Sequence, residues 1–279
     1  MITTSDGGYL ISGYTSSNNG DITDGNNGSN AVFVIKLDNT GQIEWNKTYG
    51  GTGDDRSTNL ITTSDGDYLI SGYTSSNNGD ITDGNNGSND VFVIKLDNTG
   101  QIEWNKTYGG TGDDRSTNLI TTSDGGYLIS GITASKDGDI TDGNKGLYDA
   151  WILKIDSSGI LNWNKTYGGT GDDSPIDLIT TSDGGYLIGG VTNSNDGDIA
   201  GGNKGLYDAW ILKIDSSGIL NWNKTYGGSS SDRSTNLITI SDGGYLISGI
   251  TNSNDGDITD GNNGSYDSWL FTIDKNGNY

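Results

Sequence analysis

The stretch ITTSDGDYLISG at residues 61–72 decides the fold of this chain, because close copies of it return along the whole sequence. No insertion or deletion interrupts the repeat, and the first two units differ only at Gly8/Asp67 and Ala31/Asp90. Repeats of this length are typical of solenoids, propellers or arrays of small units. The copies begin every 59 residues, at Ile2, Ile61, Ile120, Ile179 and Ile238.

Each unit predicts four short strands and no helix. Apolar and polar residues alternate or cluster in runs of about seven, and a glycine that can adopt positive φ ends each tight turn. A long polar loop separates the second run from the third. In the second unit the runs are 57–63 (STNLITT), 68–73 (YLISGY), 91–97 (VFVIKLD) and 101–107 (QIEWNKT), with turns at 64–66 and 98–100 and the loop at 74–89.

The chemistry of the four runs predicts an order within each sheet. The first run is rich in Ser and Thr, whose small side chains fit near a central axis. The second and third runs are apolar on both faces, so other parts of the protein must pack on both. The fourth run is polar enough for an outer edge strand. This is the layout of a propeller blade, and it is favoured over a long solenoid coil or an array of independent units. We therefore predict an all-β, five-bladed β-propeller of four-stranded antiparallel meanders.

The predicted propeller is one domain over residues 1–279. The fifth unit stops after its third strand, so the last blade lacks its outer strand. Two explanations stay open: the chain is cut from a longer protein, or the exposed edge pairs with a neighbour. How the ring closes is open too. The predicted blades are 2–60, 61–119, 120–178, 179–237 and 238–279.

Composition excludes several function classes. The chain has 279 residues with Lys+Arg 15 and Asp+Glu 37, a net charge of −22, and neither Cys nor His. Disulfides, Cys nucleophiles and Ser-His-Asp triads are therefore excluded, and the negative charge argues against a nucleic-acid partner. The sequence predicts no membrane span and no signal peptide at Met1-Ile2. Its regularly spaced Trp and Tyr residues argue against disorder.

The unit resembles a kelch-type blade, with Tyr68, Gly72 after the second run and Trp104 in the fourth. It departs from kelch in having one glycine, followed by Tyr73, where a pair is usual. It is more similar to the DGGY…DxWxxKxD…WxKTxGG repeats of secreted and surface proteins of bacteria and archaea, which it matches along all 279 residues, for example from Asp149 to Asp156. The resemblance implies a propeller at an extracellular or cell-surface location and no defined chemistry.

Acidic residues recur in the long loop and make calcium the one candidate cofactor. Clustered carboxylates with Gly and Asn in a flexible loop suit Ca²⁺, which takes six to eight oxygen ligands. The spacing differs from an EF-hand, there is no closing Glu, and the fourth copy has Ala200-Gly201 instead, so Asx turns are the alternative interpretation. The candidate metal ligands are Asp21, Asp24, Asp80, Asp83, Asp139, Asp142, Asp257 and Asp260.

Four other sets of residues have structural explanations. The Gly-Asp-Asp-Arg segment at 53–56 and its copies predicts ion pairs or strand caps, because every acid occurs in equivalent copies and none is singled out for catalysis. Lys95 and Asp97 predict a same-face ion pair. One set of Trp residues could bind sugars, although filling the gap between blades is favoured; the set is Trp45, Trp104, Trp163 and Trp222. Phe33, Phe92, Trp151, Trp210 and Trp269 are predicted core.

The predicted function is a non-enzymatic, extracellular or surface-displayed binding module or scaffold. Near-identical blades would give multivalent contact with a glycan, a surface protein or another copy of the chain through the fifth blade. The ligand-binding residues are not identified by the sequence. The alternatives are a propeller enzyme of the glycoside-hydrolase kind, and a recently amplified or engineered repeat with no specific ligand.

Overall fold

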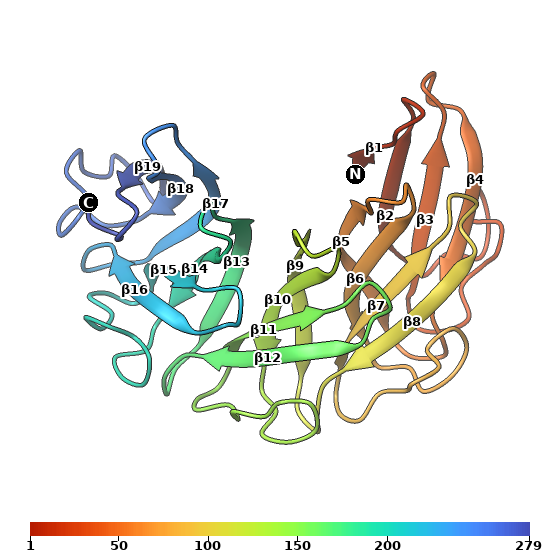
Figure 1. The fold of residues 1–279 in the computed structure, drawn as a ribbon, viewed down its shortest axis with the longest axis horizontal. Coiled ribbons are helices and arrows are strands. Elements are labelled where there is room, and N and C mark those ends of the chain that lie inside the picture. The colour runs from red at the N-terminus through yellow and green to blue at the C-terminus, as the bar shows by residue number, and fades with distance from the viewer. The chain divides into compact units, whose positions relative to one another are not determined.

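The computed structural model describes residues 1–279 and is built of strands and turns, with no helix (Figure 1). The strands form five antiparallel sheets, four of four strands and a last one of three. This confirms the predicted fold class, five propeller blades of which the fifth lacks its outer strand. No helix long and apolar enough to cross a membrane occurs.

Every sheet is a meander in which strands adjacent in sequence are neighbours in space. The first two sheets are β1 (Ile2–Thr3), β2 (Tyr9–Thr15), β3 (Ala31–Leu37) and β4 (Ile43–Tyr49), then β5 (Asp55–Thr62), β6 (Tyr68–Thr74), β7 (Asp90–Leu96) and β8 (Ile102–Tyr108). The third is β9 (Asp114–Thr121), β10 (Tyr127–Thr133), β11 (Asp149–Ile155) and β12 (Leu161–Tyr167). The last two are β13 (Asp173–Thr180), β14 (Tyr186–Thr192), β15 (Asp208–Ile214) and β16 (Leu220–Tyr226), then β17 (Asp232–Thr239), β18 (Tyr245–Thr251) and β19 (Asp267–Ile273).

The turns follow from glycines in the left-handed region. Gly66 has φ +90° in the turn between β5 and β6, and Gly100 has φ +77° in the hairpin between β7 and β8. In that hairpin the Asp97 side chain accepts hydrogen bonds from the backbone N–H groups of Thr99 and Gln101, both at 2.8 Å. The strand register shifts between Lys95 and Leu96, so this hairpin, predicted with a turn at 98–100, carries a β-bulge.

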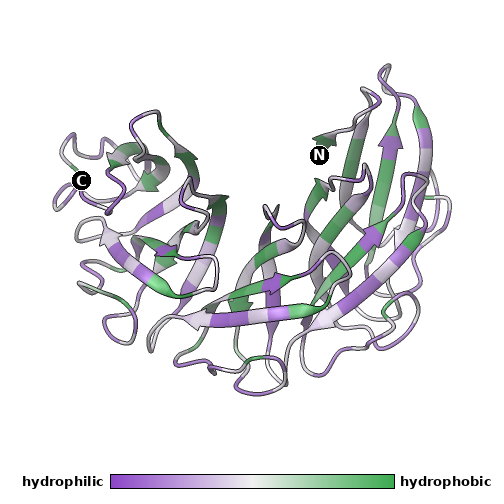
Figure 2. Cartoon of the chain, viewed as in Figure 1, coloured by the Kyte–Doolittle hydropathy of each residue, from purple (hydrophilic) through white to green (hydrophobic).

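The second and third strands of the inner sheets are buried on both faces, as predicted. Every residue of β7, β11, β14 and β15 is buried. Figure 2 shows hydrophobic residues along the strands and mostly hydrophilic ones in the loops. The predicted aromatic core is confirmed for Phe92, Trp151, Trp210 and Trp269, whereas Phe33 is half-buried. Phe92 packs where a Cβ on Gly72 would lie 2.6 Å from its ring, so only glycine fits opposite it in β6.

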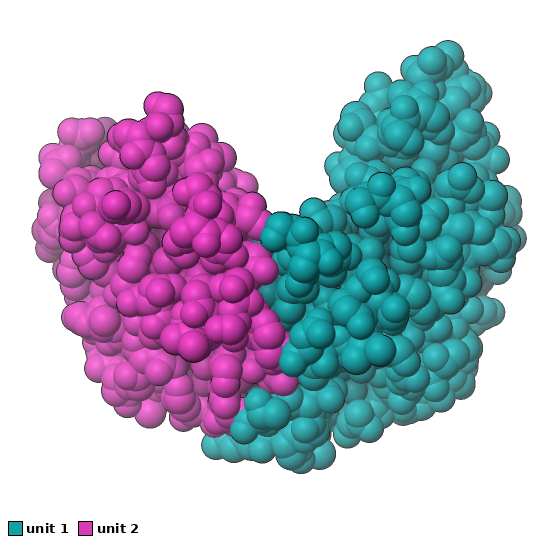
Figure 3. All heavy atoms as spheres, in the orientation of Figure 1, with its two compact units in different colours: residues 1–129, 135–141, 154–162 teal, residues 130–134, 142–153, 163–279 magenta.

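The chain divides into two compact units, called unit 1 and unit 2, each larger than one 59-residue repeat and coloured in Figure 3. Unit 1 has a core that includes Leu10, Val34, Ile70 and Phe92, and unit 2 has a core that includes Ile211, Ile247 and Phe271. Each core joins residues of successive sheets, so no sheet buries its apolar faces alone. Unit 1 is residues 1–129, 135–141 and 154–162; unit 2 is residues 130–134, 142–153 and 163–279.

A tyrosine at the end of each fourth strand ties its sheet to the next hairpin. The Tyr49 hydroxyl donates to the carbonyl oxygen of Gly100 at 2.7 Å, and Trp45 packs on the same glycine. Burial raises the pKa of the Tyr49 hydroxyl and keeps it neutral. The Trp set therefore fills gaps between sheets, as favoured from the sequence. The other hydroxyl–carbonyl pairs are Tyr108–Gly159, Tyr167–Gly218 and Tyr226–Gly277.

Candidate functional site

The first acid of three of the four long-loop pairs closes a glycine corner and leaves its partner acid outside. Asp80 Oδ2 accepts the Gly50 N–H at 3.1 Å, and Asp139 Oδ2 accepts the Gly109 N–H at 3.0 Å. Asp257 Oδ2 accepts the Gly227 N–H at 2.9 Å. Each acid reaches back to the corner that precedes its own sheet. These contacts use the carboxylates as caps for backbone N–H groups.

The second acid of the pair faces a lysine or solvent. Asp83 lies 3.1 Å from Lys106 Nζ, and Asp142 lies 3.1 Å from Lys165 Nζ. The remaining predicted ligands Asp21, Asp24 and Asp260 are exposed. The structure brings no three acidic side chains into a group that could hold a metal ion. Calcium binding by these loops stays a prediction, and the contacts of these acids are long-range caps and ion pairs rather than the local Asx turns of the alternative interpretation.

A different set of carboxylates lies buried at the glycine corners, and it includes the Asp residues that begin third strands, for which the sequence predicted no role. Asp173 at the start of β13 accepts the Gly169 N–H and the Ser194 hydroxyl, both at 2.8 Å, and also the Thr192 hydroxyl. Asp149, which begins β11, is fully buried beside it. Burial raises the pKa of Asp149 to about 6, and the nearby Asp173 charge adds to the shift. An Asp directly before a wholly apolar strand was the signal in the sequence.

The lysine of each third strand pairs with the Asp of the tight turn, so the predicted Lys95–Asp97 pair is wrong. Lys95 Nζ lies 2.6 Å from Asp65 and 2.8 Å from Glu103. Asp97 instead binds its own hairpin, because the turn presents N–H groups closer to it than the ammonium. The Lys95 ammonium lowers the pKa of Asp65 to about 2. Equivalent pairs are Lys36–Asp6, Lys154–Asp124 and Lys213–Asp183.

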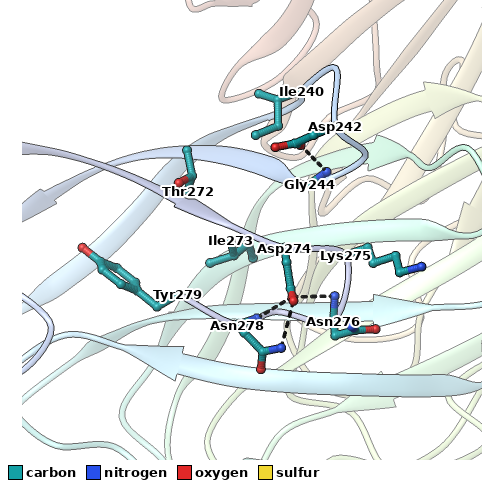
Figure 4. A pocket seen from close by; sticks show the side chains of 10 residues that line it. All are labelled: Ile240, Asp242, Gly244, Thr272, Ile273, Asp274, Lys275, Asn276, Asn278 and Tyr279. Carbon is teal, nitrogen blue, oxygen red and sulfur yellow. Dashed lines mark hydrogen bonds between the residues drawn. The ribbon is translucent and has the colours of Figure 1, made fainter.

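The fifth sheet breaks this pattern. Thr272 stands where the other sheets have lysine, and a cavity of about 490 Å³ lies between the β17–β18 turn and the segment after β19. Figure 4 shows Asp242 and Asp274 on its wall, each accepting backbone N–H groups: Asp242 from Gly244, and Asp274 from the two asparagines that follow it. Those bonds lower the pKa of Asp274, so its carboxylate stays ionised.

Equivalent pockets open between successive sheets at the Thr-Thr-Ser turns. Both are lined by hydroxyl groups from the end of one first strand and by the turn and tyrosine of the next sheet. In unit 1 the pocket measures about 230 Å³ and is lined by Thr62, Thr63, Ser64, Thr121, Thr122, Gly125 and Tyr127. In unit 2 it measures about 480 Å³ and is lined by Thr180, Thr181, Ser182, Thr239, Ile240, Ser241, Gly243 and Tyr245.

The Gly-Asp-Asp-Arg segments divide their two acids between surface and interior. Arg56 Nε donates to Asp54 at 3.0 Å, and the guanidinium lies 4.4 Å from the centre of the Tyr14 ring. Asp55 is fully buried and accepts the Gly51 N–H at 2.8 Å. The predicted ion pair and strand cap are therefore both present, on neighbouring residues.

Three proteins similar to the chain share 28% or less of their aligned residues with it. No family model matches it. It is 28% identical over 172 residues to the regulatory protein FlaEY of Caulobacter vibrioides, across 57% of this chain and 18% of that protein, so it spans under a fifth of that relative. A protein of unknown function from Bacteroides caccae matches with TM-score 0.45 and 14% identity, over 77% of this chain and 61% of that one. A variant of the Synechocystis apocarotenoid oxygenase matches with TM-score 0.41 and 14% identity, over 98% and 69%.

Proposed function

We propose that the chain is a non-enzymatic binding or scaffold module displayed outside the cell or on its surface. The observation that carries this proposal is the recurrence of one pocket, built from equivalent residues, at sheet junctions in both units. A repeated site suits multivalent attachment, in which weak contacts add through effective concentration.

The lining of these pockets favours a polyhydroxylated ligand such as a glycan. Thr181, Ser182 and Ser241 present hydroxyl groups, which both donate and accept hydrogen bonds, and Tyr245 supplies an aromatic wall. Neither pocket contains a lysine, an arginine or a carboxylate on its wall. A charged small molecule would find no counter-charge there, whereas a neutral sugar needs none.

The carboxyl groups favour binding over glycoside hydrolysis. A hydrolase needs a carboxylic acid of raised pKa and a second carboxylate facing the same substrate. The acids of raised pKa near 6, Asp90, Asp149 and Asp208, are completely buried and repeat from sheet to sheet. The accessible Asp274 has a lowered pKa and is unsuited to donate a proton.

A glycan array followed by calorimetry with any oligosaccharide that binds tests the proposal. Ser182→Trp fills the unit 2 pocket from an exposed position and is expected to weaken binding, whereas Ser216→Trp, on an exposed hairpin away from it, is expected to have no effect. Equal loss in both variants, or hydrolysis of the bound sugar, contradicts the proposal. A blank array combined with a strictly monomeric mass contradicts it as well and leaves a spacer without a ligand.

A further inference from the structure

Two buried carboxylates meet at the glycine corner between β12 and β13. A Cβ built on Gly168 would lie 2.7 Å from Asp173 Oδ2 and 2.8 Å from Asp149 Oδ1. Both oxygens therefore face the same point beside this glycine, and both residues have no exposed surface. Two negative charges at the same buried corner repel each other, because little water is present to screen them.

The two carboxylates differ in how well they are hydrogen-bonded. Asp173 accepts three donors, Gly169 N–H and the hydroxyls of Thr192 and Ser194, which favour its ionised form. Asp149 accepts one, the Lys145 N–H at 3.1 Å, on Oδ2. Its Oδ1 is buried with no hydrogen-bond partner. A buried oxygen without a donor, next to an acceptor, is the place where a proton is held.

The same arrangement occurs at the next corner. A Cβ on Gly227 would lie 2.6 Å from Asp232 Oδ2 and 3.0 Å from Asp208 Oδ1, and Asp208 Oδ1 again has no partner. The Lys204 N–H binds the other oxygen of Asp208 at 2.8 Å. Asp90 Oδ1 beside Gly109 is a third copy.

We infer that each of these carboxylate pairs binds one proton. The unpartnered oxygen carries this proton and donates it in a hydrogen bond to the facing carboxylate. The hydrogen bond tightens the junction between successive sheets in mildly acidic surroundings. The step is a proton uptake from solvent: Asp149 becomes neutral, its O–H donates to Asp173 Oδ2, and no other bond changes. Unprotonated, the pair carries two buried charges and holds the junction less firmly.

The other charged groups around the pair do not neutralise its two carboxylates. Asp198 approaches from the long loop, where its Oδ2 accepts the Gly168 N–H at 3.1 Å, and adds negative charge. Lys145 is the nearby cation, but its ammonium pairs with Asp198. Burial and the Asp172 charge raise the pKa of Asp173. At the next corner Asp257 and Lys204 take the places of Asp198 and Lys145, with an ammonium–carboxylate distance of 2.6 Å.

The direction of the pH effect is fixed by the raised pKa. Asp149 and Asp208 have pKa values near 6 in the folded protein against 3.8 for a free Asp side chain, mainly because of burial. The stabilisation by the bound proton is complete below about pH 4 and is lost as pH rises through 6. Lowering the pH from 7.5 to 5 is expected to raise the folding equilibrium constant about tenfold for each pair.

The turn carboxylates do not interfere within this window. Asp65, Asp124 and Asp183 have pKa values lowered to about 2, so their contribution is lost only below about pH 4. The turn carboxylates therefore change stability little between pH 7.5 and 5. Because burial also raises the pKa of Asp80, the difference between parent and variant, rather than the parent's gain alone, reports on the buried pairs.

The test compares urea unfolding of the full chain at pH 7.5 and pH 5 in four variants. Asp149→Asn and Asp208→Asn mimic the protonated acid, and each variant is expected to be more stable than the parent at pH 7.5. When the pH falls from 7.5 to 5, the folding equilibrium constant of each variant should rise about tenfold less than that of the parent. Asp267→Asn is the matched control: its Oδ2 accepts the same backbone bond, from Asn263 at 2.7 Å, but the chain places no facing carboxylate there. Ala31→Asp, at the corner that lacks this acid beside Asp55, should gain a pH effect.

Carbon-13 NMR of the Asp carboxyl carbons supplies a second readout independent of stability. One signal that titrates near pH 6 and vanishes in Asp149→Asn supports the shared proton. Titration of every Asp below pH 5 overturns it, and so does an equal pH response in Asp267→Asn. Stabilisation of the parent by millimolar calcium at pH 7.5, lost in Asp149→Asn, would also overturn it, because a cation rather than a proton would then occupy the pair.

Discussion

The tyrosine that ends each fourth strand should carry a measurable share of the stability of its junction. Tyr49→Phe removes one hydroxyl and keeps the ring that packs in the unit 1 core. The lost bond joins the hydroxyl to the Gly100 carbonyl oxygen at 2.7 Å, and Tyr49 is only 4% exposed. Removing one partner leaves a buried carbonyl without its donor, which costs about 1–2 kcal/mol.

This loss should appear as a lower melting temperature. For a chain of this size we expect Tyr49→Phe to melt roughly 2–6 °C below the parent, as measured by circular dichroism at neutral pH. Tyr226→Phe, which loses the 2.7 Å bond to Gly277 in the other unit, should give a similar shift. Because the two sites share no partner, the double variant should show the sum of the two losses.

A control separates the hydrogen bond from the general effect of removing a hydroxyl. Tyr14 is 51% exposed, and its ring lies under the Arg56 guanidinium, a contact that phenylalanine retains. Tyr14→Phe should therefore melt with the parent. If Tyr49→Phe also melts with the parent, or if Tyr14→Phe falls as far, the reasoning that the inter-sheet bond stabilises the junction is refuted.

Four further outcomes are expected. Gly218→Ala should lower the free energy of unfolding in urea by more than about 2 kcal/mol, because it combines positive φ (+81°) with a Cβ 2.8 Å from the Trp163 ring. Gly184→Ala has a similar φ (+82°) but open space around the Cβ, so it should lose only about 1 kcal/mol. Lys95→Met should lower the melting temperature more than Lys154→Met, because it leaves three carboxylates without their cation instead of one. Below about pH 4 urea stability should fall as the turn carboxylates protonate, since their pKa values are lowered in the folded state. Calorimetric titration with calcium decides the loop prediction: no heat and no melting shift would reject it.

The strands and their order were predictable because each depends on a few consecutive residues. The second strand was predicted at 68–73 and observed as β6, Tyr68–Thr74; the fourth was predicted at 101–107 and observed as β8, Ile102–Tyr108. Glycine fixed the turns, because no other residue adopts positive φ without strain. The two-sided burial of β7 followed from its unbroken apolar run.

The partners of charged groups could not be predicted in the same way. Lys95 lies two residues from Asp97, yet it pairs with Asp65, 30 residues away, because a hairpin turn competes for the nearer carboxylate. The calcium prediction for the loop acids came from their spacing, which did not show that Asp80 caps Gly50 or that Asp83 faces Lys106. Spacing along the chain does not show which way each loop folds back.

The sequence by itself determined the repeat, the strand pattern and the absence of Cys and His chemistry, because these depend on residue type and local periodicity. Only the tertiary structure decided which carboxylates are buried together. Asp149 and Asp173 are 24 residues apart in different strands, and they face each other because the glycine corner between β12 and β13 admits both side chains. Burial then raises the pKa of both, for Asp149 to about 6, because a low-dielectric interior disfavours the charged form.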